Sequence, residues 1–450
     1  MINIPHYNDF INSYANYFFD IHNSSTSLVA KNLVTLISNS ISIAAYTKYL
    51  EKLDYQFFNS QQRKLSFNVK HIRSRSIDTT FGTLTFKRRV YQHKVTKKYF
   101  YYIDDIILNL AAYQRLSNEL ITNIFNDVTT DSYQTIASKF SLSKSTIYNL
   151  IKKFNNFVID LARPKIKVPI LYIQADECYI SLQKKNDNAK TNKVMLHHLC
   201  VHQGLKNVSK GRNQLVNKLL FTKAYNETID DFYARIHNTI DTIYEYDDLY
   251  FYGDGAHWIK SCCNQLSGTF ILDLFHSYQA ISRICKSNKQ HIDNLIHLCQ
   301  HNKKSEFVDY IANNLDFRNF SDYQTKHFKY LKSNWDYIQR NYTLKSSVGC
   351  SQEGINYHSF ASRLTTTPKG FSEANARFIA QLICMKNNQA NNFNTELIKL
   401  VQTANTLAKS KKDNLQSINQ NINTVKQCRI AQSNTNKVFR TICTDYGVLN

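Results

Sequence analysis

The chain has 450 residues, of which 43% are hydrophobic and 13% aromatic, so it can bury the cores of two or three domains and is not expected to be disordered. Lys and Arg number 56 against 34 Asp and Glu, a formal net charge of +22 at pH 7. This imbalance favours a polyanionic partner, nucleic acid first, over a small neutral substrate.

An anionic membrane surface is the rival partner, and the sequence argues against it. No run of about 18 apolar residues occurs, and Met1 to Asp20 lacks a basic segment followed by an apolar one. The ten cysteines contain no Cys-x-x-Cys pair, which argues against a zinc knuckle or ribbon and for reduced thiols, many of them in the core. We therefore expect a cytoplasmic protein.

The N-terminal part is expected to be helical up to about residue 60 and β-rich from 61 to 110. Apolar residues follow helical spacing in the first segment, and short β-prone runs with a turn at Phe81-Gly82 follow between Leu65 and Tyr102. Basic residues, among them Arg88 and Arg89, would stud this small sheet and form a phosphate-contacting surface. An ordinary solvated basic face fits the same pattern equally well.

Residues 111–164 are expected to carry a helix-turn-helix. Ser143 can cap a second helix that buries Ile147, Leu150, Ile151 and Phe154. A tight turn before a helix with a polar outer face is typical of a unit whose second helix enters the major groove of double-stranded DNA, although ordinary helical hairpins share the pattern. The outward residues predicted to contact DNA are Lys144, Ser145, Thr146 and Asn149.

A new domain is predicted from about residue 165, beginning with a long strand over 168–183. Asp176 and Glu177 are adjacent on this strand and must face opposite sides, so only one of them can serve a given site. On the next strand, 194–203, His198, Cys200 and His202 share a face. A zinc site there is disfavoured, because side chains two apart on a strand stand almost 7 Å apart.

Asp254 follows a strand buried on both faces, Leu249 to Tyr252, and lies between Gly253 and Gly255. The two glycines are expected to leave clearance for a metal ion, a phosphate or DNA, although an Asp-Gly turn alone would look the same.

Further acids follow in the next segments. A strand over 269–276 is expected to carry Asp273 and His276 at its end, a helical insertion covers 277–345, and Glu353 lies in a turn over 349–354. A helix is expected over 372–385, and the segment 401–450 is polar.

Five ordered blocks resemble the ISLre2-type insertion-sequence transposases, a family also catalogued as uncharacterised proteins. The resemblance covers most of the chain and departs mildly between Arg363 and Phe371, where the family has Met and Ser in place of Leu and Thr, and Trp in place of Phe. The blocks are Arg75-Ser76-Ile77-Asp78-Thr79-Thr80-Phe81-Gly82 with Lys87-Arg88-Arg89-Val90-Tyr91, Ala175-Asp176-Glu177, Gly253-Asp254-Gly255-Ala256-His257-Trp258-Ile259-Lys260, Leu272-Asp273-Leu274-Phe275-His276, and Glu353-Gly354.

The resemblance implies an α/β fold: a ribonuclease-H-like mixed sheet, formed by 165–276 and 346–400, with a helical insertion before the last acid. By motif, the catalytic and metal-binding triad of this DDE-type domain would be Asp176, Asp254 and Glu353, and Asp273-x-x-His276 is similar to a signature of Mutator-like relatives. Phosphodiester transfer agrees with such a triad, because carboxylates bind Mg²⁺ and two Mg²⁺ ions, with Mn²⁺ as a substitute, can activate the nucleophile and stabilise the leaving oxygen.

The sequence thus predicts a DNA transposase that cleaves transposon ends, joins their 3′-hydroxyls to target DNA and acts as a homo-oligomer. Its partners would be terminal inverted repeats and target DNA, not a membrane. The alternatives are a transposase-derived DNA-binding protein and a metal-dependent nuclease without strand transfer. His276 would support the site or be a buried histidine, and Trp258 would stack on an unpaired base or belong to the core. Further candidates for phosphate contacts are Lys260, Arg363 and Lys369.

Overall fold

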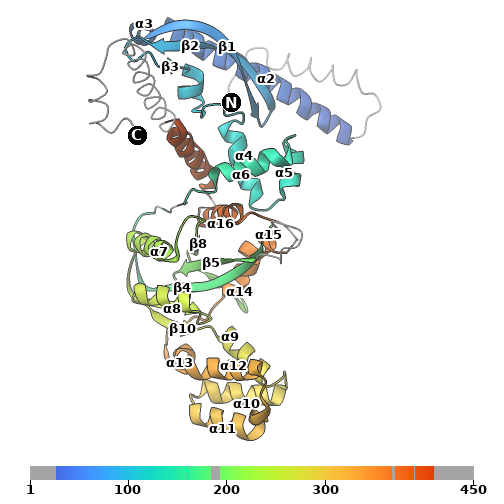
Figure 1. Cartoon of the computed structure of the whole chain (residues 1–450), viewed down its shortest axis with the longest axis vertical. Coiled ribbons are helices and arrows are strands. Elements are labelled where there is room, and N and C mark those ends of the chain that lie inside the picture. Colours follow the sequence, from blue (N-terminus) through green and yellow to red (C-terminus); the bar gives the residue numbers. More distant parts are fainter. Residues whose placement is uncertain are drawn as a thin grey trace, which may run out of the picture. The chain divides into compact units, whose positions relative to one another are not determined.

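The computed structural model describes residues 27–159, 161, 163–183, 193–366, 370–389 and 391–409. The chain divides into two compact units, Met1–Asn123 with Glu396–Asn450, and Ile124–Thr395 (Figure 1). No helix within the described ranges is long and apolar enough to cross a membrane. Eight cysteines lie in these ranges, all as free thiols and all but Cys350 buried. The predictions for residues 1–26 and 410–450 lie outside the described residues.

The smaller unit is built on a long antiparallel hairpin. β1 (Phe67–Thr79) pairs with β2 (Gly82–His93), and β3 (Tyr99–Phe100) extends the sheet beside β2. The β-rich segment and its turn next to Gly82 are therefore confirmed. α2 (Ser27–Asn59) packs against β2. The unit also contains α3 (Gln61–Ser66), η1 (Ile103–Ile107), the start of α4 (Asn118–Val128) and most of a helix over 393–409.

A five-stranded mixed sheet forms the centre of the larger unit, in the order β10-β9-β4-β5-β8. β4 pairs antiparallel with β5 and β5 with β8, whereas β9 runs parallel to β4 and β10 parallel to β9. The strands are β4 (Ile166–Ser181), β5 (Lys193–His202), β8 (Leu219–Thr222), β9 (Tyr244–Gly253) and β10 (Thr269–Leu272), with a separate hairpin of β6 (Leu205–Ser209) and β7 (Arg212–Leu215).

The two faces of the sheet bury different sets of side chains. Leu171 and Ile173 of β4 join the main core with residues of α7 (Ile229–Ile243) and α8 (His257–Gln265). Alternate residues, including Tyr172, pack on the opposite face near Val348. This alternation follows from the twofold period of a strand, and it separates the residues of β4 into two environments.

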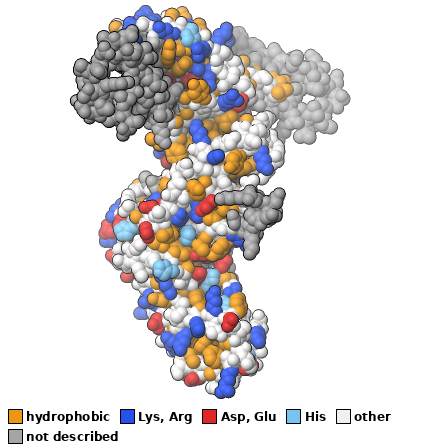
Figure 2. All heavy atoms as spheres, viewed as in Figure 1, with side chains coloured by type: hydrophobic (Ala, Val, Ile, Leu, Met, Phe, Trp, Pro, Cys, Tyr) orange, Lys and Arg blue, Asp and Glu red, His pale blue; other side chains and the backbone are white. Residues whose placement is uncertain are grey.

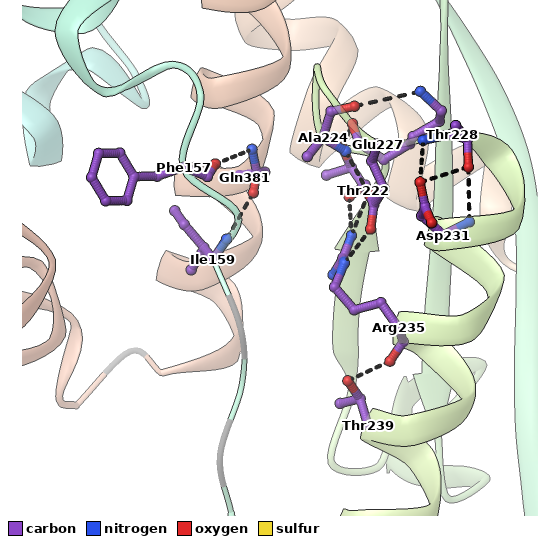
Figure 3. A network of polar contacts seen from close by, with 11 residues as sticks. Phe157, Ile159, Thr222, Ala224, Glu227, Thr228, Asp231, Arg235, Thr239 and Gln381 are labelled. Carbon is purple, nitrogen blue, oxygen red and sulfur yellow. Dashed lines mark hydrogen bonds and ion pairs between the residues drawn. The ribbon is translucent and has the colours of Figure 1, made fainter. Parts of the chain in front are cut away.

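A buried ion pair fastens α7 to the edge of the sheet (Figure 3). Arg235 Nε lies 2.6 Å from Glu227 Oε1, and its Nη2 donates to the backbone oxygen of Thr222 at 2.9 Å. Thr228 and Asp231 form a capping box that starts the helix. Nearby, Gln381 of α16 (Glu373–Asn388) bonds to the backbone of Phe157 and Ile159, which fixes the segment leading into the sheet.

The helices expected between the sheet and the last acid are present. They are α9 (Leu274–Ile284), α10 (Lys289–Gln300), α11 (Lys304–Asn314), η2 (Phe317–Asn319), α12 (Asp322–Ser333) and α13 (Trp335–Thr343), followed by α14 (Gln352–Ile355), η3 (Asn356–Ala361) and α15 (Ser362–Leu364).

The strand predicted over 269–276 was too long. It ends at Leu272, because the Asp273 side chain accepts a hydrogen bond from Phe275 N and caps α9. His276 therefore lies on a helix.

The predicted helix pair is also present. α5 (Tyr133–Lys139) and α6 (Lys144–Phe154) begin at the N-caps Ser132 and Ser143, and the turn between them includes Ser141 with a φ of 53°. The pair groups with the sheet in the larger unit. Asn155, which follows α6, donates to Asn375 Oδ1 of α16 at 2.7 Å, so the helix pair is packed onto the sheet-bearing unit.

Candidate active site

Asp176 and Glu177 face opposite sides of β4, as the strand period predicts. Asn356 Nδ2 donates to Asp176 Oδ2 at 3.4 Å and to the backbone oxygen of Glu177 at 3.2 Å. The Glu177 carboxylate instead accepts hydrogen bonds from Trp258 Nε1 and, at 3.2 Å, from the Tyr179 hydroxyl. Only Asp176 therefore lies on the face where the other candidate acids gather.

Asp254 lies in the turn between β9 and α8. Its Oδ1 accepts a hydrogen bond from Ala256 N at 2.8 Å, and its backbone oxygen accepts one from the Tyr330 hydroxyl of α12 at 2.6 Å. The turn is thus held from its own chain and from the helical insertion.

The glycines beside Asp254 serve internal packing, which differs from the clearance for DNA that the sequence suggested. A Cβ on Gly253 would stand 2.7 Å from Ile259 Cγ2, and one on Gly255, whose φ is +88°, would stand 3.0 Å from Leu272 Cδ1. Both positions face protein atoms, so the internal packing of the chain requires a residue without a side chain at each of them.

Glu353 lies in α14, and its side chain is 51% exposed. His276 Nε2 lies 3.9 Å from Glu353 Oε1 and 3.8 Å from Asp273 Oδ2, so this histidine stands between two acids. Burial of Asp273 raises the pKa of its carboxyl, an effect that the Phe275 backbone N–H and His276 oppose.

The three predicted triad acids interact through their charges. Burial, with smaller contributions from the carboxylates of Glu353 and Asp254, raises the pKa of Asp176 to about 6, while a backbone hydrogen bond at Glu177 and the charge of His276 oppose this rise. Acids from β4, from the turn after β9 and from α14 thus approach one another, and a cation among them would relieve their repulsion.

A buried polar network that the sequence did not predict anchors the chain just before Glu353. Gln174 Oε1 accepts from Ser351 N and Oγ, both at 3.0 Å, and Gln174 Nε2 lies 3.0 Å from His202 Nε2. Gln352 Nε2 lies 2.7 Å from Nδ1 of His198, the cross-strand partner of Asp176. The available signal was the position of Gln174 two residues before Asp176, on the same strand face.

These contacts explain why His198, Cys200 and His202 share a buried face of β5, the pattern that the sequence analysis considered as a zinc site. Burial lowers the pKa of His198 to about 3 and that of His202 to about 4, and it raises the pKa of the Cys200 thiol to about 12. Two neutral histidines with glutamine partners and a protonated thiol make up this buried face.

The donor chemistry around Asp176 fits Mg²⁺, which prefers carboxylate oxygens. Within the described ranges, however, no three His, Cys, Asp or Glu side chains lie close enough together to hold one ion. The fold brings the acids to one face of the sheet without placing them in one coordination sphere.

The residues predicted to contact DNA occupy different environments. On α6, Lys144, Ser145 and Asn149 are exposed, and Thr146 is partly buried beside the Ser143 cap, with its Oγ1 2.9 Å from Ser143 Oγ. Lys369 lies outside the described residues.

Arg88 and Arg89 do not lie on an open basic surface as expected. Arg88 Nε lies 3.2 Å from Asp104 Oδ1, and its guanidinium stacks over the Tyr101 ring at 4.1 Å. Arg89 Nη1 lies 2.7 Å from Asp54 Oδ2. Both side chains are mostly buried, because ion pairs and aromatic rings inside the smaller unit enclose them.

Two further phosphate candidates also have internal partners. Arg363 is 3% exposed, and its Nε donates to the backbone oxygen of Val128 at 2.8 Å. Lys260 Nζ donates to Asn334 Oδ1 at 2.7 Å. Trp258 is half-buried, with the His197 ring edge-on at 4.8 Å, so the indole is packed between α8 and the sheet.

Comparison with known proteins gives the family. A model of an uncharacterised protein family, UPF0236, matches residues 26–399. UPF0236 proteins of Caldanaerobacter subterraneus subsp. tengcongensis are 25% identical over 369 residues, which is 79% of this chain and 76% or 73% of theirs. A solved Drosophila P element transposase strand transfer complex aligns with 63% of this chain and 83% of that chain at 12% identity, but its TM-score of 0.22 does not establish a shared fold. The chain belongs to the uncharacterised protein family UPF0236.

Proposed function

We propose that this protein is a DNA transposase of the ISLre2 type, which cleaves the ends of a transposon and joins the resulting 3′-hydroxyls to target DNA. The observation that carries the proposal is the approach of Asp176, Asp254 and Glu353 from three separate segments to one face of a mixed sheet. The carboxylates of Glu353 and Asp254 contribute to the raised pKa of Asp176, about 6, for which burial is the largest cause.

The topology supports a ribonuclease-H-like core. Numbered along the chain, the five strands lie in the order 5-4-1-2-3, with the first three antiparallel and the last two parallel to the first. In this sheet Asp176 lies on the first strand, and Asp254 directly follows the fourth.

The residues of the site have distinct roles in this proposal. Asp176, Asp254 and Glu353 would hold Mg²⁺, which when bound supplies positive charge to the phosphate and activates the attacking water or 3′-hydroxyl. His276 orients Glu353 from α9, and Asn356 orients the Asp176 carboxylate. Ser351 and Gln352, through Gln174 and His198, fix the start of α14 against the sheet, so the last acid has a rigid support.

The names of the relatives agree with a sequence that multiplies within a genome. One UPF0236 protein of Caldanaerobacter subterraneus carries eleven locus designations joined in a single name, and another carries four. A transposase gene is expected to be present in many copies, because transposition multiplies it within the genome.

The proposal is tested with Asp254→Asn and duplexes that carry the inverted repeats flanking the gene. In Mg²⁺, Asp254→Asn should cleave and join these ends at least about 100-fold more slowly than the parent, because loss of a metal ligand costs at least as much as loss of a residue that orients one. Asp248→Asn removes an exposed carboxylate from β9, the strand that precedes Asp254, and should behave as the parent. Parent-like cleavage and joining by Asp254→Asn would exclude the triad.

A second readout does not depend on activity. Mg²⁺ should raise the unfolding temperature of the parent and of Asp248→Asn, since a ligand that binds only the folded state stabilises it. The rise should be smaller for Asp254→Asn.

A transposase-derived DNA-binding protein is the second candidate, and the spread of the acids favours it, since within the described residues no three of them share one ion position. The same assay distinguishes the candidates. DNA binding without cleavage indicates the binding protein, cleavage without joined product indicates a nuclease, and joined product indicates the transposase.

A further inference from the structure

A groove of about 580 Å³ lies in the larger unit, and none of the three acids lines it. Its walls come from four segments: the turn after α4, the chain before β8, the helices η3 and α15, and the end of α16. The residues used below are Thr130, Lys218, His358, Ser362, Lys386 and Asn387.

The groove is lined by cations and hydroxyls, and none of its lining residues is acidic. Lys218 and Lys386 contribute ammonium groups from different walls. Thr130 and Ser362 are exposed, and their hydroxyls donate to Asp131 Oδ2 and to the backbone oxygen of His358. Lys386 Nζ donates to Thr129 Oγ1 at 3.0 Å, which holds its charge along the wall. Arg363 lies buried in the lining and adds a further positive charge. A lining of this kind attracts an anion with several oxygens.

The groove also adjoins the two functional elements of the unit. Thr130 precedes Ser132, the N-cap of α5, and so lies at the entrance to the helix pair. His358 lies on η3, which directly follows the helix that carries Glu353. Residues close in the sequence to the helix pair and to the last acid thus line the same groove.

We propose that this groove binds the phosphate backbone of duplex DNA between the α5–α6 helix pair and the acids at Asp176, Asp254 and Glu353. The identity of the anion as DNA rests on the proposed function, whereas the groove and its charge do not. Figure 2 shows Lys and Arg side chains spread over the visible face, so general attraction of DNA is expected from many places, and the groove adds fixed contacts to it.

The proposal is tested by binding of a fluorescent random-sequence DNA duplex to the full-length protein, without metal, over a series of salt concentrations. Lys218→Gln with Lys386→Gln removes two cations, so the slope of log K against log salt should become shallower by about two, and affinity at low salt should fall. Lys218→Gln alone leaves the Lys386–Thr129 hydrogen bond intact and should reduce the slope by about one.

Matched controls separate groove contacts from net charge. Lys304→Gln with Lys332→Gln removes the same charge from exposed positions on α11 and α12 and should leave the slope near that of the parent. Lys218→Arg with Lys386→Arg keeps the charge and should restore binding. Unfolding temperatures of all variants are compared with that of the parent.

A parent-like affinity and slope for the Gln pair, or an equal loss in the α11–α12 control, would overturn the proposal. Because the assay needs no cleavage, its result is separate from that of Asp254→Asn. If Asp254→Asn retains activity but the Gln pair loses DNA binding, the groove proposal is supported and the triad is wrong. If Asp254→Asn loses activity but the Gln pair binds DNA as the parent does, only the groove proposal is wrong.

Discussion

Trp258 Nε1 donates a hydrogen bond to Glu177 Oε1, and this bond joins the neighbour of Asp176 on β4 to the first turn of the helix that follows Asp254. The bond thereby ties together two segments whose acids, Asp176 and Asp254, lie 78 residues apart in the sequence. Trp258 acts here as a positioning residue.

Trp258→Phe should therefore slow Mg²⁺-dependent cleavage by about 10-fold, because a small displacement of one acid is costly in a site that depends on orientation. It should lower the free energy of unfolding by about 1 kcal/mol and leave DNA affinity unchanged. Tyr179→Phe is the control, since Tyr179 bonds to the same carboxylate but lies on β4 itself. Equal cleavage by the two variants would mean that the link between β4 and α8 has no effect on the acids.

Gly253→Ala should destabilise the fold by about 1–3 kcal/mol, because the added methyl would stand 2.7 Å from Ile259 Cγ2 and 3.3 Å from the backbone oxygen of Ala175. Gly354→Ala is the matched variant beside Glu353. No atom lies within 4 Å of a Cβ placed there, and the position is helical, so stability should be unchanged or rise. Chemical denaturation measures both. A Gly253→Ala protein as stable as the parent would show that the contact with Ile259 relaxes without cost.

His202 should contribute to loss of stability in acid. Burial lowers the pKa of this histidine to about 4, below its ordinary value near 6.5, so the unfolded state binds more protons than the folded state between these two values. The contribution of His202 to the free energy of unfolding is therefore fully present above about pH 6.5. It falls by at most about 3 kcal/mol as the pH decreases toward 4.

His202→Gln keeps a polar partner for Gln174 and should flatten this part of the stability profile, measured by denaturation at a series of pH values. His257→Gln, on the surface at the start of α8, is the control for loss of a histidine. An unchanged profile in His202→Gln would assign the acid sensitivity to other groups.

Lys144→Ala with Asn149→Ala should weaken binding to the inverted repeats by about 1–3 kcal/mol without changing the unfolding temperature, because both side chains are exposed on α6. Lys332→Ala supplies a control at an exposed position on α12. If affinity for the repeats is unchanged while nonspecific binding falls, α6 contributes charge but not sequence recognition. Point variants are preferable to removal of residues 1–160, because Asn155 and Phe154 pack against α16.

The sequence predicted what depends on local period and spacing. The alternation along β4 separated Asp176 from Glu177, the cap at Ser143 marked the second helix of the pair, and the aromatic strand before Asp254 was recognised. The strand after it was extended too far, because Asp273 could continue an apolar run or cap a helix, and only the bond to Phe275 N decides between them.

Long-range partners could not be predicted from one sequence. Arg88 and Arg363 were predicted to contact phosphate, yet Asp104 pairs with the first and the backbone oxygen of Val128 accepts from the second. Apart from the position of Gln174 on the same strand face as Asp176, the two glutamines Gln174 and Gln352 carried no signal, since a glutamine on a strand or turn is usually a surface residue. Their role follows from meeting His202 and His198, which only the pairing of β4 with β5 reveals.

The packing of α6 against α16 sets an order of events during synthesis. α16 ends at Asn388, whose side chain bonds to the backbone of Leu220 on β8. The packing of the sheet edge and that of the helix pair therefore both depend on a helix that is synthesised late. Glu353 also emerges only after the helices that hold the Asp254 turn. The helix pair can therefore pack against α16 only after all three acids have been synthesised. A fragment that ends before α16 would lack the contacts of that helix with both α6 and β8.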